Sequence, residues 1–285
     1  MRFSYYPGCA SISIAREHDS SSRTISKLLG IELAELENWN CCGADSARSI
    51  DHFASVLLPA RNLALAERDS LDLLVTCPGC YQVFSRTQQL CEADSTLRAK
   101  VNASLSSLGL TYSGKVRARH LLDVIVNDVG VAKISQGVKK QLASIKAVPY
   151  YGCQPAGFPK SSRFDDPQRP QALSKLIAAV GARPVAFPNA TRCCGGPLFM
   201  TDPEAAGSMT KNILRSATDA GGQCIVTMCE LCHFNLDARQ SGIEKRYGEK
   251  YSIAIVHFTQ LLGLALGMDS KTVGLDRNIV PFNLS

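Results

Sequence analysis

The chain has 285 residues and a net charge of +6, with 45% hydrophobic and 20% charged residues. This composition is typical of a soluble globular protein with a hydrophobic core, in one large or two ordinary domains. The positive charge is spread along the chain, so no nucleic-acid partner is expected. The longest apolar stretch, Phe258–Met268, falls short of the roughly 20 residues that cross a bilayer, and no secretory signal is recognisable. We therefore expect a cytoplasmic protein without a membrane span.

Short β-prone runs alternate with helical patterns along the chain. In chain order they are a strand at Arg2–Tyr6, helices at Ser22–Leu29 and Val56–Arg68, strands at Leu71–Thr76 and Ala147–Tyr151, helices at Gln171–Ala179 and Glu204–Ala217, and a strand at Gln223–Met228. Such alternation predicts an α/β fold with small parallel sheets flanked by helices. The segment Phe158–Pro170, rich in Pro, Asp and Ser, is predicted to form an inserted loop.

Ten of the twelve cysteines form two sets with the same layout, which is one cysteine, an adjacent pair and a CxxC. The sets are Cys9, Cys41, Cys42, Cys77 and Cys80, and then Cys153, Cys193, Cys194, Cys229 and Cys232. In both sets 34 residues separate the adjacent pair from the CxxC. This repetition predicts two pseudo-symmetric domains, at residues 1–147 and 148–285. The cysteines are expected just past the carboxyl ends of strands, where open α/β sheets place their ligands.

Metal binding is the expected role of these ten thiols, because a disulfide framework does not persist in a reducing cytosol. Thiolates are soft ligands that select iron–sulfur clusters or zinc, and four are enough for a cubane cluster or a structural zinc. Five thiolates per half, two of them adjacent in sequence, suit a larger or more open cluster. Zinc in one half is the alternative. Cys91 and Cys224 lie outside both sets and are expected to be incidental or packed in the core.

Two histidines, His120 and His257, recur at matching places, each after a β-like run and before an apolar helix. A hydrogen-bonded residue at the helix start is the favoured interpretation, and proton donation to a leaving thiolate is the catalytic role to test. Arg192, beside Cys193, is a candidate for orienting an anionic substrate, although a surface arginine is the simpler interpretation.

The repeated pattern Cx(n)CCGx(n)CxxC resembles the cysteine-rich CCG domain found in the B-type subunit of heterodisulfide reductase. The resemblance covers essentially the whole chain and includes stretches around the ligands, at His120–Gly130, Phe164–Pro170, Cys193–Leu198 and Val256–Gly267. It implies that each set of five cysteines holds a non-cubane [4Fe-4S] cluster. It also implies that a disulfide is cleaved between the two clusters, with one electron from each.

The resemblance implies partners as well, namely one ferredoxin-like subunit and one flavin-containing subunit of a heterodisulfide-reductase-like complex. The chain has no dinucleotide fingerprint of its own, so electrons must pass through such partners. The reaction would be reductive cleavage of a disulfide, as in methanogens, or oxidation of a thiol or persulfide, as in sulfur-oxidising bacteria. In the second setting a lipoate-carrying sulfur carrier protein is a further expected partner. The alternative is an electron-relay CCG protein, as in glycolate, lactate or glycerol-3-phosphate dehydrogenases.

Overall fold

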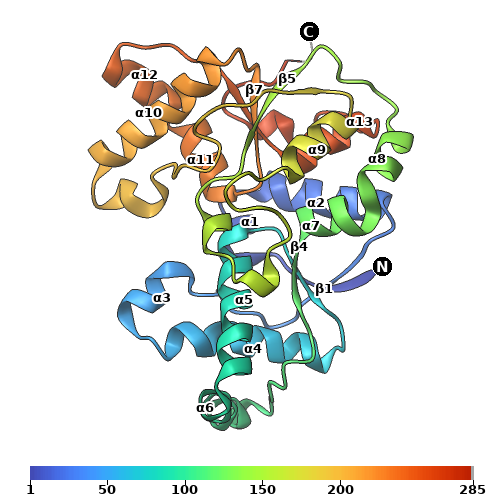
Figure 1. Cartoon of the computed structure of the whole chain (residues 1–285), viewed down its shortest axis with the longest axis vertical. Helices are drawn as coiled ribbons and strands as arrows, with labels where there is room; N and C mark the ends of the chain where they lie inside the picture. Colours follow the sequence, from blue (N-terminus) through green and yellow to red (C-terminus); the bar gives the residue numbers. More distant parts are fainter. Residues whose placement is uncertain (284–285) are drawn as a thin grey trace.

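Two four-stranded parallel sheets, one in each half of the chain, form the framework of the protein, whose computed structural model describes residues 1–283. The strand orders are β2-β1-β3-β4 and β6-β5-β7-β8, so the same connectivity occurs twice (Figure 1). The strands are β1 (Arg2–Tyr6), β2 (Glu32–Glu35), β3 (Leu73–Val75), β4 (Ala118–His120), β5 (Lys146–Tyr150), β6 (Arg183–Pro184), β7 (Cys224–Thr227) and β8 (Ala254–His257). All their pairings are parallel. The predicted α/β fold with two pseudo-symmetric halves is confirmed.

Helices flank both sheets. In the first half they are α1 (Gly8–Ser11), α2 (Arg16–Leu28), α3 (Ala44–Ile50), α4 (Ala54–Arg68), α5 (Pro78–Ala93), α6 (Ser95–Leu105), η1 (Ser106–Leu108), α7 (Leu121–Asp123), the π-helix η2 (Val124–Gly130) and α8 (Val131–Gly137). In the second half they are η3 (Gln154–Gly157), η4 (Lys160–Ser162), α9 (Ala172–Ala179), η5 (Gly196–Met200), α10 (Pro203–Asp219), α11 (Glu230–Ala238), α12 (Gln240–Tyr247), α13 (Phe258–Ala265) and η6 (Leu275–Arg277). Among the described helices, none is both long and apolar enough to span a membrane.

Helix α2 begins at Arg16, six residues before the predicted helix start at Ser22. Its buried face is largely polar and includes His18, Ser21 and Ser26. A helix whose buried face carries hydroxyl and imidazole groups lacks the apolar periodicity on which a sequence-based assignment depends. The buried polar face indicates that α2 packs against polar groups as well as against the apolar core.

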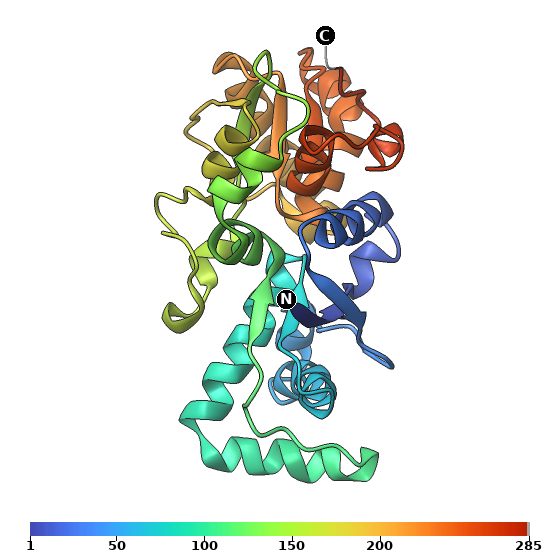
Figure 2. The same cartoon turned by 90° about the vertical axis from the view of Figure 1, so that its right-hand side faces the viewer.

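The two halves are interlocked through a shared hydrophobic core cluster, beside which each half has a cluster largely its own. The largest core cluster joins Ile25 and Leu121 of the first half to Leu173 and Phe258 of the second. Helix α2 packs on α13, and the segment from α7 to α8 packs on α9, although each pair comes from opposite halves of the chain (Figures 1 and 2). Strand β5 begins at Lys146, next to the predicted domain boundary. The last two residues of the predicted second domain, 284–285, lie outside the described residues.

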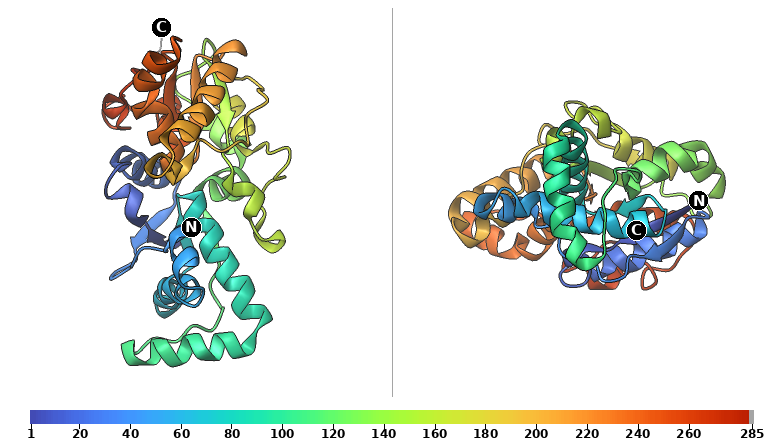
Figure 3. Two further views of the ribbon diagram at one scale, coloured as in Figure 1. Left: turned by 90° about the vertical axis from the view of Figure 1, so that its left-hand side faces the viewer. Right: turned by 90° about the horizontal axis from the view of Figure 1, so that it is seen from below.

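The predicted loop at 158–170 crosses from the second half onto the first. It contains the short turn η4, and the phenol of Tyr81 on α5 donates to the carbonyl of Ser162 at 2.6 Å. Phe158 and Phe164 pack edge-on against the Tyr81 ring, with centroids 4.9 and 6.0 Å away. The left panel of Figure 3 shows this segment beside α5, in keeping with the contact between Tyr81 and Ser162. The insertion is therefore a second bridge between the halves.

The shared core predicts that the chain unfolds as one unit. Ile25 of α2 is fully buried, and a Cβ built on Gly263 of α13 would lie 3.3 Å from its Cδ1 atom. Replacing Ile25 with alanine leaves a cavity in the core of both halves, so we expect a loss of about 2–5 kcal/mol in unfolding free energy. Denaturant unfolding followed by far-ultraviolet circular dichroism and by tyrosine fluorescence should show a single transition at a lower midpoint.

The matched control is Ile50→Ala. The Ile50 side chain is 86% exposed, so its truncation should change the unfolding free energy by less than about 0.5 kcal/mol. Two separate transitions in the Ile25→Ala variant, one of them unshifted, would show that the halves are independent domains.

Candidate metal centres

The five cysteines of the first set converge at the carboxyl ends of three parallel strands. Cys9 follows β1, the adjacent pair follows β2, and Cys77 stands at the N-terminus of α5 after β3. The Sγ atoms of Cys41 and Cys9 are 3.8 Å apart, and those of Cys42 and Cys80 are 3.3 Å apart. Cys77 in turn contacts Cys80. All five predicted ligands of this half are thus brought together.

The second set repeats this arrangement. Cys153 contacts Cys193, Cys194 contacts Cys232, and Cys229, at the N-terminus of α11, contacts Cys232. Each contact has its counterpart at the corresponding position of the first set. The two CxxC motifs both open helices, where the helix dipole favours thiolate over thiol.

A tyrosine from the first strand of each sheet holds the adjacent-cysteine loop in place. Tyr6 on β1 donates its phenol proton to the carbonyl of Asn40, at 3.1 Å, and Tyr150 on β5 donates to the carbonyl of Arg192, at 2.7 Å. The Tyr150 oxygen also lies 4.0 Å from the Cys232 sulfur. The sequence has a Tyr-Tyr pair shortly before the first cysteine of each set, but it does not show that the carboxyl end of β1 or β5 meets the cysteine loop.

The glycine after each cysteine pair has a conformation that other residues rarely adopt. Gly43 and Gly195 have φ angles of +85° and +95°. A Cβ on Gly43 would lie 2.7 Å from the Ala47 side chain, and one on Gly195 would lie 2.9 Å from that of Ala206. The CCG turn therefore needs glycine both for its left-handed backbone and for its close approach to the following helix.

The five thiols in each site lie too close together for all of them to ionise at once without a compensating cation. Hydrogen bonds from neighbouring thiols lower the pKa of Cys41 and Cys193 to about 2. The same contacts raise the pKa of their adjacent partners, Cys42 and Cys194, to about 12. One thiolate per group thus suppresses ionisation of its neighbours. Cationic iron relieves this repulsion, so the donor set fits an iron–sulfur cluster, and also zinc.

Each site is open on one side. Cys9, Cys41 and Cys153 are exposed and Cys193 is half-buried, whereas Cys42, Cys80, Cys194 and Cys232 are buried. A group held by these sulfurs is covered by protein on one side and accessible on the other. An electron-transfer partner or a sulfur substrate can therefore approach the exposed side of each site.

Glu230 connects the two sites. It follows Cys229 in sequence, and its Oε1 atom accepts a hydrogen bond from Thr76 Oγ1 of the first half, at 3.1 Å. It also contacts Cys77, and burial raises the pKa of this carboxyl to about 7. The corresponding position of the first half is Pro78. Sequence analysis missed Glu230, and the departure from a CPxC pattern was the available signal.

One hydrogen bond to sulfur in the second site has no counterpart at the corresponding residue of the first. Asn235, one turn after Cys232, donates from Nδ2 to the Cys194 sulfur at 3.5 Å and to the Gly196 carbonyl at 3.1 Å. The corresponding residue after Cys80 is Val83, which has no donor. Because hydrogen bonds to sulfur stabilise the more negative, reduced state of a cluster, the second site is expected to have the higher potential.

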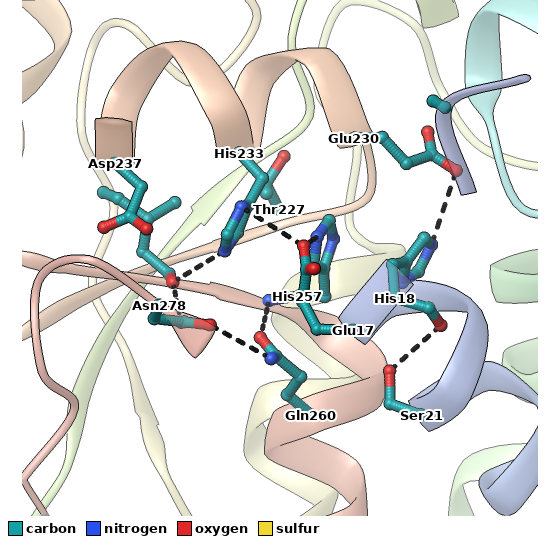
Figure 4. A network of polar contacts seen from close by, with 12 residues as sticks. Glu17, His18, Ser21, Thr227, Glu230, His233, Asp237, His257, Gln260 and Asn278 are labelled. Atoms are coloured by element: carbon teal, nitrogen blue, oxygen red, sulfur yellow. Dashed lines mark hydrogen bonds and ion pairs between the residues drawn. The ribbon is translucent and has the colours of Figure 1, made fainter. Parts of the chain in front are cut away.

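Both candidate catalytic histidines are fully buried at the start of a helix. His120 Nδ1 accepts the backbone N–H of Leu122 at 3.1 Å, and its ring stacks on Phe164. His257 is stacked between His18 and His233, with ring centroids 4.1 Å away on either side (Figure 4). The predicted helix-start position is seen for both, and a catalytic role stays a prediction. Arg192 is exposed beside Cys193.

The two cysteines outside the sets are both buried. Cys224 lies on β7 and is fully buried, and burial raises the pKa of its thiol to about 12. Cys91 on α5 is 1% exposed and belongs to the core cluster of the first half.

The fold and the sites define a duplicated α/β protein with two five-cysteine sites, and comparison with known proteins identifies its family. The cysteine-rich CCG domain matches residues 3–85 and 148–237. Over 281 residues the chain is 31% identical to a protein of Archaeoglobus profundus that is itself described as like the B-type subunit of heterodisulfide reductase, covering 96% of this chain and 93% of the relative. The chain belongs to the CCG cysteine-rich domain family, as a member resembling the B-type heterodisulfide reductase subunit.

Two other relatives point to different enzymes. The chain is 34% identical over 278 residues to the 8-methylmenaquinol:fumarate reductase membrane anchor subunit of Wolinella succinogenes, covering 98% of this chain and 96% of the relative. It is 28% identical over 282 residues to the B-type subunit of the ferredoxin/F(420)H(2)-dependent CoB-CoM heterodisulfide reductase of Methanosarcina acetivorans, covering 98% and 94%. Family membership therefore leaves the partner enzyme open.

A solved structure has the same fold. The crystal structure of a hypothetical protein from Helicobacter pylori superimposes with a TM-score of 0.79 at 12% identity, covering all of this chain and 53% of that one. At this identity the likeness concerns the fold alone, and this chain spans only about half of the other protein.

The asymmetry between the sites predicts the effect of exchanging one side chain. Asn235→Val removes a donor worth about 1 kcal/mol, so the midpoint potential of the second site should fall by about 40 mV. Potentiometric titration followed by electron paramagnetic resonance measures this change. The matched variant Val83→Asn should raise the potential of the first site. An unchanged second-site potential in Asn235→Val would mean that this amide does not tune the centre.

Proposed function

We propose that the chain is the iron–sulfur subunit of a multi-subunit oxidoreductase of the heterodisulfide reductase type, cleaving a disulfide or oxidising a thiol or persulfide. The observation that carries the proposal is the presence of two complete five-thiol sites, built alike and connected through Glu230. A disulfide is reduced by two electrons, and two one-electron centres in one chain match that requirement.

The proposed cofactors are two [4Fe-4S] clusters of the non-cubane type, one in each site. The ligands would be the five cysteines of each set, Cys9, Cys41, Cys42, Cys77 and Cys80 in one half and Cys153, Cys193, Cys194, Cys229 and Cys232 in the other. When bound, such clusters supply single electrons. The matching contacts in the two halves favour the same group in both sites over zinc in one of them.

The residues around the sulfurs have three tasks in this proposal. Tyr6 and Tyr150 hold the cysteine loops against the strand ends, and the glycines of the two CCG turns allow helices to approach closely. Arg192, exposed beside Cys193, is the candidate for contacting an anionic substrate. His120 and His257 remain the candidate proton donors to a leaving thiolate.

The proposed partners are one ferredoxin-like subunit and one flavin-containing subunit, in a cytoplasmic complex. Their contact with the chain would be near the exposed thiols, because electron transfer requires a short path to each centre. A lipoate-carrying sulfur carrier protein is the proposed partner if the reaction runs in the oxidative direction.

An electron-relay role is the second candidate, favoured by the similarity to the fumarate reductase membrane anchor subunit. Such a relay would pass electrons between partners without binding a disulfide. The two candidates share the cofactors and differ only in whether a sulfur compound reacts at the chain itself.

Metal analysis tests the cofactor part of the proposal. Protein purified without oxygen should contain about eight irons and eight acid-labile sulfides per chain. In the variants Cys77→Ala and Cys229→Ala, which each lack one ligand, we expect iron to fall to about four per chain. Cys91→Ala, which removes a buried thiol outside the sets, is the control and should keep its iron. Equal iron in all three variants would contradict the ligand assignment.

Activity separates the two candidate functions. The chain with reduced clusters should convert a disulfide such as that of oxidised lipoamide to thiols, using reduced viologen as the electron donor. Loss of either site should abolish turnover, since both electrons are needed. Clusters that accept and return electrons at undiminished rates while no disulfide or thiol reacts would instead establish the relay.

A further inference from the structure

A buried group of three ionisable side chains lies where the two halves meet. Glu17 comes from α2 of the first half, and His233 and His257 come from α11 and the end of β8 in the second (Figure 4). One oxygen or nitrogen atom from each lies within 4.8 Å of the others, and all three side chains are buried. Within residues 1–283, the ion-pair partners of Glu17 are these two histidines.

The nitrogen atoms of this group lack ordinary hydrogen-bond partners. His233 Nε2 lies 3.1 Å from the carbonyl of Ile255, so it carries the ring proton and leaves Nδ1 as a bare lone pair. That Nδ1 atom faces Glu17 Oε1 at 3.9 Å, which is too long for a hydrogen bond. Nε2 of the fully buried His257 makes no hydrogen bond among the described residues and lies 3.5 Å from the same Glu17 oxygen. Two acceptor atoms, Glu17 Oε1 and His233 Nδ1, therefore face each other in a buried space, where a cation would satisfy both.

We propose that Glu17, His233 and His257 bind one zinc ion, at a site separate from the ten cysteines and independent of the proposed function. Two imidazoles and a carboxylate are a donor set that suits zinc. Burial lowers the pKa of His257 well below its ordinary value, which keeps the ring in the neutral form that binds metals. The ion would also compensate the buried charge of Glu17, for which the described chain supplies no lysine or arginine.

The distances suit a tetrahedral ion. Bonds of about 2.0–2.1 Å place the ligand atoms of tetrahedral zinc about 3.3–3.4 Å apart. Glu17 Oε1 lies 3.5 Å from His257 Nε2 and 3.9 Å from His233 Nδ1, so the carboxylate is already close to the spacing that zinc requires from each histidine. The hydrogen bond from His233 to Ile255 is the outer contact that typically orients a metal-binding histidine. A water would complete the coordination.

Binding requires one ring to turn. The His233 and His257 rings are stacked at an angle of 15°, so their lone pairs lie in nearly parallel planes and cannot both point at one ion. His257 is the ring that turns: it gives up its stacking on the two neighbouring rings, whereas turning His233 would break its hydrogen bond to Ile255. The ion then ties α2 to α11 and β8, and so fixes the two cysteine sites relative to each other.

The first test is the coordination of zinc in the wild-type protein, purified without oxygen. We expect about one zinc per chain, with an X-ray absorption spectrum that shows nitrogen and oxygen neighbours at about 2.0–2.1 Å and no sulfur near 2.3 Å. A sulfur shell would place the zinc in a cysteine site and overturn the proposal. Protein free of zinc would overturn it too.

The second test uses variants with a matched control. Glu17→Gln and His257→Gln should each lower the zinc content at least about tenfold while iron and sulfide stay unchanged. His120→Gln alters the buried histidine at the corresponding position of the first half, and it should keep its zinc. Zinc retained in both site variants, or lost equally from the control, would contradict the assignment. If a variant does not fold, the absorption spectrum of the wild-type protein still decides.

Discussion

The parallel pairing of β1 with β3, and of β5 with β7, is the constraint on which both metal centres depend. Parallel strands end at the same edge of a sheet, so a cysteine following one strand meets the CxxC that follows its neighbour. The adjacent pair reaches the same edge through the loop after β2 or β6. The backbone hydrogen bonding of the sheets therefore brings the ten thiols to two strand edges.

The interlocked halves explain why the sites can act together. A core shared by α2 and α13, and the loop at 158–170 lying on α5, keep the two sheets in a defined relation. Glu230 then touches both motifs at once. Two clusters on independent domains would vary in separation, whereas a common core makes that separation a property of the fold. The proposed zinc site, built from both halves, would serve the same end.

The duplication is close but incomplete, and the differences lie next to the ligands. Asn235 faces a sulfur where the first half has Val83, and a carboxylate stands in the second CxxC where the first has proline. Such differences leave the sulfur positions unchanged and alter only their hydrogen bonding and charge. Under the proposed function the two sites would differ in potential and pass electrons in a preferred direction, which suits a catalytic role and a relay alike.

The sequence by itself determined the α/β class, the duplication and the identity of the ten thiols, because matched spacing and strand–helix alternation are local patterns. It also indicated that His120 and His257 begin helices. Only the tertiary structure placed Tyr6 and Tyr150 on the cysteine loops. It alone extended α2 to Arg16 and joined Glu17 to His233 and His257. These contacts link residues far apart in the chain, so they depend on how one half packs on the other. The start of α2 could not be predicted because its buried face is polar and lacks the apolar periodicity that marks a helix.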